Sequence, residues 1–194
     1  MTTPLSLLRQ LNSRQRPGIW QTHPLASWSE EFRLRYVAVI AFVTAMGRQT
    51  TAAEEEGFGN FCAQLSITTE DTQEQLTMRA SLDGATLLYI LKGIRERSLH
   101  VHLLLDILWL HISLGKHSLS EQTALSELCL LLGQPARAWE PLAALVQEVR
   151  QSPGSTIEAF KLEGDQRLPE GFFDAKSEFR ALVDEMARIW SWLK

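Results

Sequence analysis

Two stretches of the sequence share one pattern, and that pattern decides the fold. The first is YVAVIAFVTAMGRQTTAAEEEGFGNFCAQL at residues 36–65. The second is LLDILWLHISLGKHSLSEQTALSELCLLL at residues 104–132, about 67–68 residues further along. Each begins as an apolar helix, passes through a loop with glycine and a basic residue, and restarts at a Thr/Ser-x-x-Glu signal before a second helix. The repeat predicts an all-α bundle built from two related helix-loop-helix hairpins.

Helix signals outside the repeat extend the bundle at both ends. We expect residues 1–29 to be an N-terminal extension, residues 30–150 the bundle, and residues 151–194 a turn or short hairpin followed by a C-terminal helix. Within the bundle, capping boxes are expected at 27–30, 51–54 and 118–121, and one long helix over 68–97 with Gly84 inside it, allowing a close helix contact. The C-terminal helix carries an apolar stripe: Phe179, Leu182, Val183, Met186, Ile189, Trp190 and Leu193. We expect this stripe to pack on the bundle or on a partner, and a homodimer through it is a further hypothesis.

Composition sets the class of protein. The 194 residues are 45% hydrophobic and 22% charged, which is typical of one globular domain. A formal charge of -4 gives no field to attract nucleic acid, so we expect no nucleic-acid partner. The longest uncharged run, 36–47, is shorter than the roughly 20 residues that a membrane-spanning helix needs. Without a signal peptide pattern either, we expect a cytoplasmic protein with no membrane span.

The two cysteines occupy equivalent places in the two hairpins. Cys62 and Cys129 both fall on the apolar face of a predicted helix. We interpret them as small buried hydrophobic residues in a reducing compartment, with a disulfide between them as the alternative.

The doubled helix, glycine loop and Thr/Ser-x-x-Glu pattern over roughly residues 30–150 resembles the TerB-like family of tellurite-resistance and related proteins. The resemblance implies an all-helical bacterial protein, with a role in envelope stress or in defence against phage or toxic agents. Many family members carry an acidic residue just before the loop glycine and an acidic metal-binding surface. The corresponding residues here are Met46 and Leu114, which supply no oxygen ligand. We therefore expect neither a metal nor another cofactor.

A few polar residues are candidates for chemistry. His102 and Asp106 share a helix face, and we expect them to form a buried pair that satisfies itself. An alternative hypothesis is a small helical enzyme using His102, Asp106 and His111. The glutamates at 54–56 are typical of a capped helix start. A second alternative is a degenerate metal-binding or metal-sensing domain, with ligands drawn from Glu54, Glu55, Glu121 and Asp106.

The tryptophans have two interpretations: they pack the terminal segments onto the bundle, or they bind a partner. Six tryptophans are many for this length, and several lack an obvious place in a bundle core. We expect a non-enzymatic protein-interaction module, an adaptor or regulatory subunit of a cytoplasmic bacterial complex. The predicted partner-binding residues are Trp20, Trp28, Trp192, Arg9, Arg14 and Arg16. A basic group at one helix junction (Lys92, Arg95, Arg97 and His100) is interpreted as a solvated turn, with an anion-binding or acidic-partner patch as the alternative.

Overall fold

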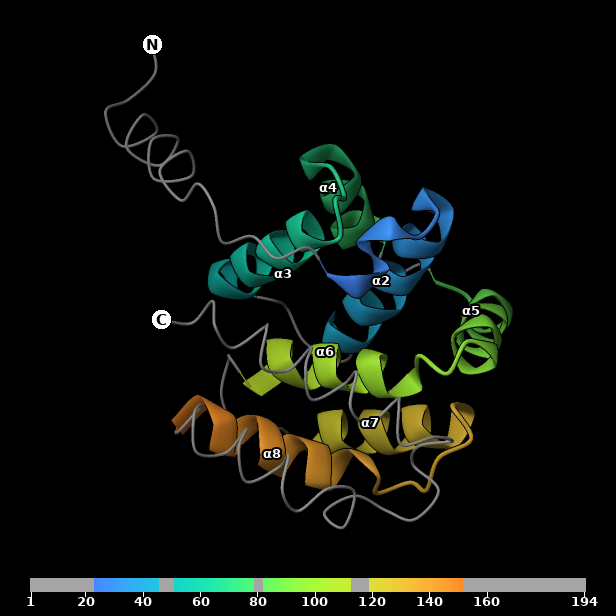
Figure 1. Ribbon diagram of the computed structural model, residues 1–194, viewed down its shortest axis with the longest axis vertical. Coiled ribbons are helices and arrows are strands. Elements are labelled where there is room, and N and C mark those ends of the chain that lie inside the picture. Colours follow the sequence, from blue (N-terminus) through green and yellow to red (C-terminus); the bar gives the residue numbers. More distant parts are fainter. Residues whose placement is uncertain (1–22, 46–50, 79–81, 113–118, 152–194) are drawn as a thin grey trace.

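The computed structural model describes residues 23–45, 51–78, 82–112 and 119–151. These residues form one short 3-10 helix and seven α-helices, with no strand among them (Figure 1). The helices are η1 (Pro24–Ser27), α2 (Glu30–Ala45), α3 (Ala52–Gln64), α4 (Thr69–Met78), α5 (Gly84–Glu96), α6 (His100–Ile112), α7 (Leu119–Leu131) and α8 (Trp139–Gln151). The all-α fold that the sequence predicts is thereby confirmed. None of these helices is long and apolar enough to cross a membrane.

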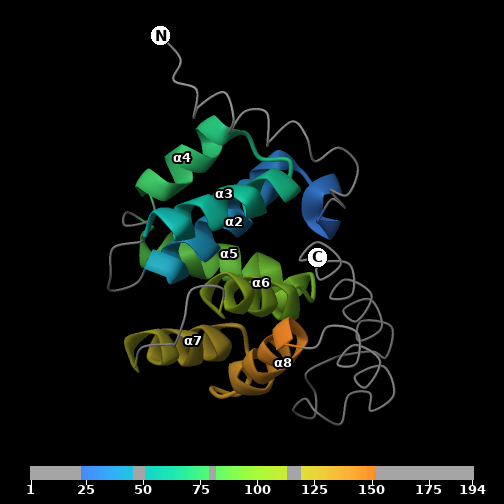
Figure 2. The ribbon, with the colours of Figure 1, turned by 90° about the vertical axis from the view of Figure 1, so that its left-hand side faces the viewer.

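The repeat is visible in the helix bounds and extends beyond a hairpin. α3 and α7 differ by 67 residues at both ends, and the last residues of α2 and α6 differ by the same amount. In each repeat the first and second helices both pack against a third, α4 in the first repeat and α8 in the second. α2 and α6 pack against each other at the junction, so in Figure 2 α6 lies between the helices of the first repeat and the pair α7 and α8. The unit is therefore three helices, with α5 as the connection.

The core follows the same 67-residue offset. In the second helix of each repeat and the residue after it, four pairs of corresponding positions are buried in both copies: Phe58 and Leu125, Phe61 and Leu128, Cys62 and Cys129, Leu65 and Leu132. Both cysteines are free and buried, as the first interpretation predicted. Burial raises the pKa of the Cys62 thiol to about 12 and that of Cys129 to about 11.

Helix starts agree with the sequence at one place and correct it at two. Thr68 caps α4, since its hydroxyl accepts the Asp71 N–H at 3.1 Å. At α2 the cap is Ser29, which accepts the Phe32 N–H, so the predicted capping box from Ser27 is wrong.

The single helix predicted over 68–97 is also wrong. It is two helices, and the second begins where Asp83 accepts the N–H groups of Ala85 and Thr86 at 2.9 and 3.0 Å. Gly84 is thus the first residue of α5, and a Cβ placed there would meet nothing within 4 Å, so no close helix contact explains it.

Three helices end in the same left-handed turn. The residues after the last turns, Ser66, Ser98 and Gly133, have φ of 56°, 54° and 77°. After α3, the N–H of Ile67 reaches back to the Cys62 carbonyl at 3.0 Å, and Gln134 makes the same bond to Cys129 at 2.8 Å after α7. These are Schellman endings, in which two N–H groups beyond the helix satisfy carbonyls of its last turn. In the first repeat the guanidinium of Arg33 also donates to the carbonyls of Leu65 and Ser66, which ties α2 to the end of α3.

Candidate functional site: a buried His–Asp–Tyr network

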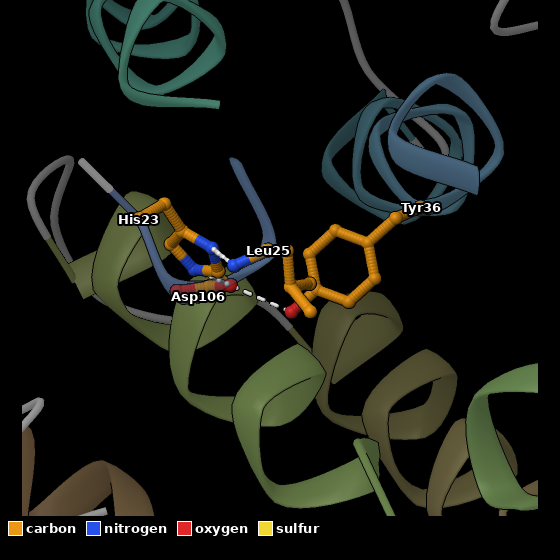
Figure 3. A network of polar contacts seen from close by, with 4 residues as sticks. All are labelled: His23, Leu25, Tyr36 and Asp106. Carbon is orange, nitrogen blue, oxygen red and sulfur yellow. Dashed lines mark hydrogen bonds and ion pairs between the residues drawn. The ribbon is translucent and has the colours of Figure 1, made fainter. Parts of the chain in front are cut away.

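One polar network lies inside the apolar core and joins elements that are far apart in the sequence. Asp106 is buried in the middle of α6, where nearly every neighbour on the helix is apolar. Its Oδ2 atom accepts the hydroxyl of Tyr36 from α2 at 2.6 Å and lies 3.1 Å from Nε2 of His23 (Figure 3). The His23 and Asp106 side chains are only 1% and 5% exposed. A carboxylate buried this deeply has to be hydrogen-bonded, and here two donors meet it.

The hydrogen bonds assign the proton on the imidazole ring. Nδ1 of His23 accepts the backbone N–H of Leu25 at 3.1 Å, so that nitrogen carries no proton. The ring proton therefore sits on Nε2 and is donated to Asp106. A neutral imidazole and an ionised carboxylate satisfy every one of these bonds. In an imidazolium, the proton on Nδ1 would face the backbone N–H of Leu25, so two donors would meet without an acceptor.

Local structure explains how His23 comes to this place. Pro24 fixes the first position of η1, where the lack of an N–H costs nothing, and His23 acts as its N-cap. The backbone N–H of His23 donates to the carbonyl of Gln64 at 3.1 Å, near the end of α3. The ring also packs edge-on against Phe61 with centroids 5.7 Å apart. η1 is thus fastened to α3 by backbone and ring contacts and to α6 by the imidazole.

The network holds helices together and offers no open position to a reactant. Both ring nitrogens of His23 are engaged, and the carboxylate is enclosed by the core. In this structure the network joins the segment before α2 to α6, and Tyr36 of α2 is the third residue bound to it.

The predicted His102–Asp106 pairing is corrected by this geometry. The hydrogen bonds found at Asp106 come from His23 and Tyr36, which lie 83 and 70 residues away, and not from the histidine one turn earlier. His102 itself is half-buried, and the side chain of His111 lies outside the described residues. The missed signal was an acid in the apolar middle of α6 and a tyrosine at the start of the apolar run of α2, because each polar group needs a buried partner.

The residues proposed for a metal site do not converge in the part of the chain that the structure describes. There, no three histidine, cysteine, aspartate or glutamate side chains lie close enough together to hold an ion. Glu55 is exposed, Glu121 is buried in the first turn of α7, and Asp106 belongs to the network. The Glu54 side chain, Met46, Leu114 and Ser118 lie outside the described residues.

Of the six predicted partner-binding residues, Trp28 alone lies in the described ranges. It is half-buried, stacks on Phe32 with centroids 4.9 Å apart, and has the Arg97 guanidinium 5.9 Å from its ring. Trp20, Trp192, Arg9, Arg14 and Arg16 lie outside the described residues, as do the predicted hairpin and C-terminal stripe.

The basic side chains at the α5–α6 junction make separate contacts with other parts of the protein. Arg97 lies over Phe32 and donates to the carbonyl of Gly93 at 2.9 Å. Lys92 pairs with Glu96 along α5, and His100 is buried at the start of α6. The turn is therefore not fully solvated, as first interpreted, because the side chains of Arg97 and His100 pack against the protein.

A scan against protein-family models, a search of curated proteins and a search of solved structures each found no match to this chain.

Proposed function

We propose that this protein is a non-enzymatic interaction module, an adaptor or regulatory subunit, whose repeat bundle presents the outer face of α7 to a protein partner. The α7 outer face is the solvent-facing surface made by Leu119, Gln122, Thr123, Glu127, Leu130 and Leu131. The observation that carries the proposal is the exposure of its three leucines, which are 80%, 61% and 43% exposed for Leu119, Leu130 and Leu131. Large apolar side chains gathered on one exposed face favour an interaction site.

The first repeat shows that the fold does not need these leucines. The residues 67 positions earlier, on the matching face of α3, are Ala52, Ala63 and Gln64. Four core positions correspond in the two copies, Phe58 with Leu125, Phe61 with Leu128, Cys62 with Cys129 and Leu65 with Leu132, so α3 buries the matching face without the leucines. A role outside the packing of the repeat accounts for their presence in α7.

The hydroxyl groups on and beside this face make hydrogen bonds within the protein. The Thr123 hydroxyl donates to the Leu119 carbonyl at 3.0 Å, and the Ser126 hydroxyl donates to that of Gln122 at 2.9 Å. Ser126 also accepts the indole N–H of Trp139 at 3.1 Å, across from α8. Hydroxyls whose bonds are made within the protein are less costly to cover than free ones. With Glu127 as its one charged residue, this face suits an apolar partner.

The resemblance to TerB-like proteins adds a setting to the proposal, namely a bacterial complex that acts in stress or phage defence. The predicted contact residues Trp20, Trp28, Trp192, Arg9, Arg14 and Arg16 are proposed to add a second contact with the partner.

The test is an affinity capture from the native host with two matched variants. Leu119→Ala, Leu130→Ala and Leu131→Gln together give α7 the residues that α3 already carries at these places, so the bundle should fold unchanged. A stoichiometric partner bound by the wild type and lost from this triple variant supports the proposal. A partner retained by the triple variant but lost on Trp28→Ala would move the interface to the other face. If the wild-type chain captures no protein from the native host, the interaction function is refuted.

A further inference from the structure

Arg95 differs from the other basic side chains of the bundle. Among the lysine and arginine side chains that the structure describes, it is the one with no ion pair, hydrogen bond or ring contact. The others bind backbone carbonyls or glutamates: Arg33, Arg35, Lys92, Arg97 and Arg137. Arg95 is exposed in the last turn of α5. Its guanidinium presents several donors in a fixed fork, which suits a carboxylate from another molecule.

The side chain of Arg95 lies at the end of α7, where the α7 outer face ends. A Cβ placed on Gly133 would meet Nη1 and Cδ of Arg95 at 3.4 and 3.5 Å. The N–H of Gly133 donates to the carbonyl of Leu130 at 3.0 Å, so this turn belongs to the same end of α7 as the exposed Leu130 and Leu131. The apolar face is therefore followed by a positive charge.

The first repeat has an arginine at the corresponding turn, but with its donors in use. Ser66 corresponds to Gly133 at the 67-residue offset. There the guanidinium of Arg33 donates to the carbonyls of Leu65 and Ser66, which ties α2 to the end of α3. Arg95 makes no such bond among the residues that the structure describes, so at the second turn the guanidinium donors are available to a partner.

The charges around the face determine which charge on a partner would complement it. Glu127 is exposed on the α7 outer face and repels an acid placed over its middle. Glu96 follows Arg95 in the sequence but pairs with Lys92, so it leaves the charge of Arg95 uncompensated. The complementary segment has apolar side chains over the leucines and an acidic side chain at the Gly133 end.

We propose that Arg95 binds an aspartate or glutamate of the protein that docks on the α7 outer face. The partner segment is thus apolar along α7 and acidic at the end that meets Arg95. This rests on the proposed function, because it names the chemistry of the partner of that same face. An ion pair beside an apolar contact loses water when the interface closes, so it contributes more than a pair in open solvent.

The test starts from the protein that the wild type captures from an extract of the native host. That protein is purified and titrated against the wild type, Arg95→Glu, Arg95→Lys and Lys92→Glu. Lys92→Glu is the matched control, because it makes the same change of charge one turn away on α5, at a side chain that is 75% exposed. We expect Arg95→Glu to raise the Kd at least about tenfold, and the other two variants to raise it less than about threefold.

Arg95→Lys also allows the contact to be mapped. A carbodiimide activates a carboxyl group, and a lysine amine that touches this group displaces the activating moiety and forms an amide. We expect mass spectrometry to find the lysine introduced at position 95 joined to an aspartate or glutamate of the captured protein, and Lys92 not joined to it. Apolar residues should flank that acid in the cross-linked peptide.

The outcomes separate this inference from the proposed function. A protein that is lost from the triple leucine variant but binds Arg95→Glu as tightly as the wild type would overturn the inference and leave the α7 interface standing. Equal losses on Arg95→Glu and Lys92→Glu would also overturn it, because they show a general effect of net charge, as would a complex without a cross-link at position 95. A wild type that captures no protein would overturn both. Circular dichroism melts show that the variants remain folded.

Discussion

Nε2 of His23 lies 3.1 Å from Oδ2 of Asp106, although 83 residues separate them in the sequence. The contact joins the N-cap residue of η1 to the middle of α6, and Tyr36 of α2 donates to the same carboxylate oxygen. All three side chains are buried, and one oxygen of Asp106 accepts the hydrogen bonds of both His23 and Tyr36.

Removing the Tyr36 hydroxyl tests how much the network stabilises the bundle. Tyr36→Phe deletes a donor to an ionised carboxylate, so we expect the free energy of unfolding to fall by about 2 kcal/mol. Urea denaturation measures the change. Tyr89→Phe removes the same atom from an exposed ring and should leave stability unaltered within about 0.5 kcal/mol. Equal effects at the two positions would contradict the role assigned to the network.

His23→Ala should cost more, about 3 kcal/mol, because it also uncaps η1 and removes the ring packed on Phe61. Combined with Tyr36→Phe, the two losses should not add, since both act on one oxygen of Asp106. A double-mutant cycle should give a coupling of at least about 0.5 kcal/mol. Strict additivity would show that the two side chains stabilise the fold independently.

The left-handed turns predict a gain of stability from glycine. Ser66→Gly and Ser98→Gly remove the Cβ strain of a positive φ, and each should raise the unfolding free energy by about 0.5–1 kcal/mol. Thermal melts followed by circular dichroism measure this. Ser126→Gly within α7 is the control and should have the opposite sign. A loss at Ser66 and Ser98 would mean that the strain is relieved in another way.

The cap of α5 predicts a pH effect at the acid end. The Thr86 hydroxyl, together with the backbone N–H groups of Thr86 and Ala85, lowers the pKa of Asp83 below its ordinary 3.8. The stabilisation is therefore present above pH 3.8 and is lost as the pH falls through the folded-state pKa. Asp83→Asn keeps a capping oxygen that does not titrate, so its melting temperature should fall less between pH 5 and about pH 2.5 than that of the wild type. Parallel curves for the two proteins would rule out the cap as the cause.

The buried thiols predict an effect at the alkaline end. The pKa is raised from 9.0 to about 12 at Cys62 and to about 11 at Cys129, so the folded state keeps its thiol protons longer than the unfolded state. Their contribution is complete below pH 9 and is lost as the pH rises, by up to about 1.4 kcal/mol per pH unit for each thiol. The double variant Cys62→Ala and Cys129→Ala should lose stability less steeply between pH 9 and about pH 11 in denaturation curves. An identical slope would show that other groups govern alkaline unfolding.

The sequence by itself determined the local structure and the repeat. Apolar spacing located the helices, and the Thr68 cap was readable because a cap depends on residues three or four positions away. It also placed Cys62 and Cys129 at matching buried positions, since each helix face repeats every three to four residues. The break before α5 was available in Asp83 and Gly84, although the surrounding helical pattern concealed it.

Only the tertiary structure decided which residues meet across the bundle. Helix spacing assigned Asp106 to His102, four residues away, while the packing of α2, η1 and α6 brought Tyr36 and His23 to it instead. The grouping of α4 and α8 as third helices of the repeats was equally invisible, because no local rule states which helix covers which. Periodicity and capping act over one turn of helix, whereas the partner of a buried polar group is set by which helices share a core.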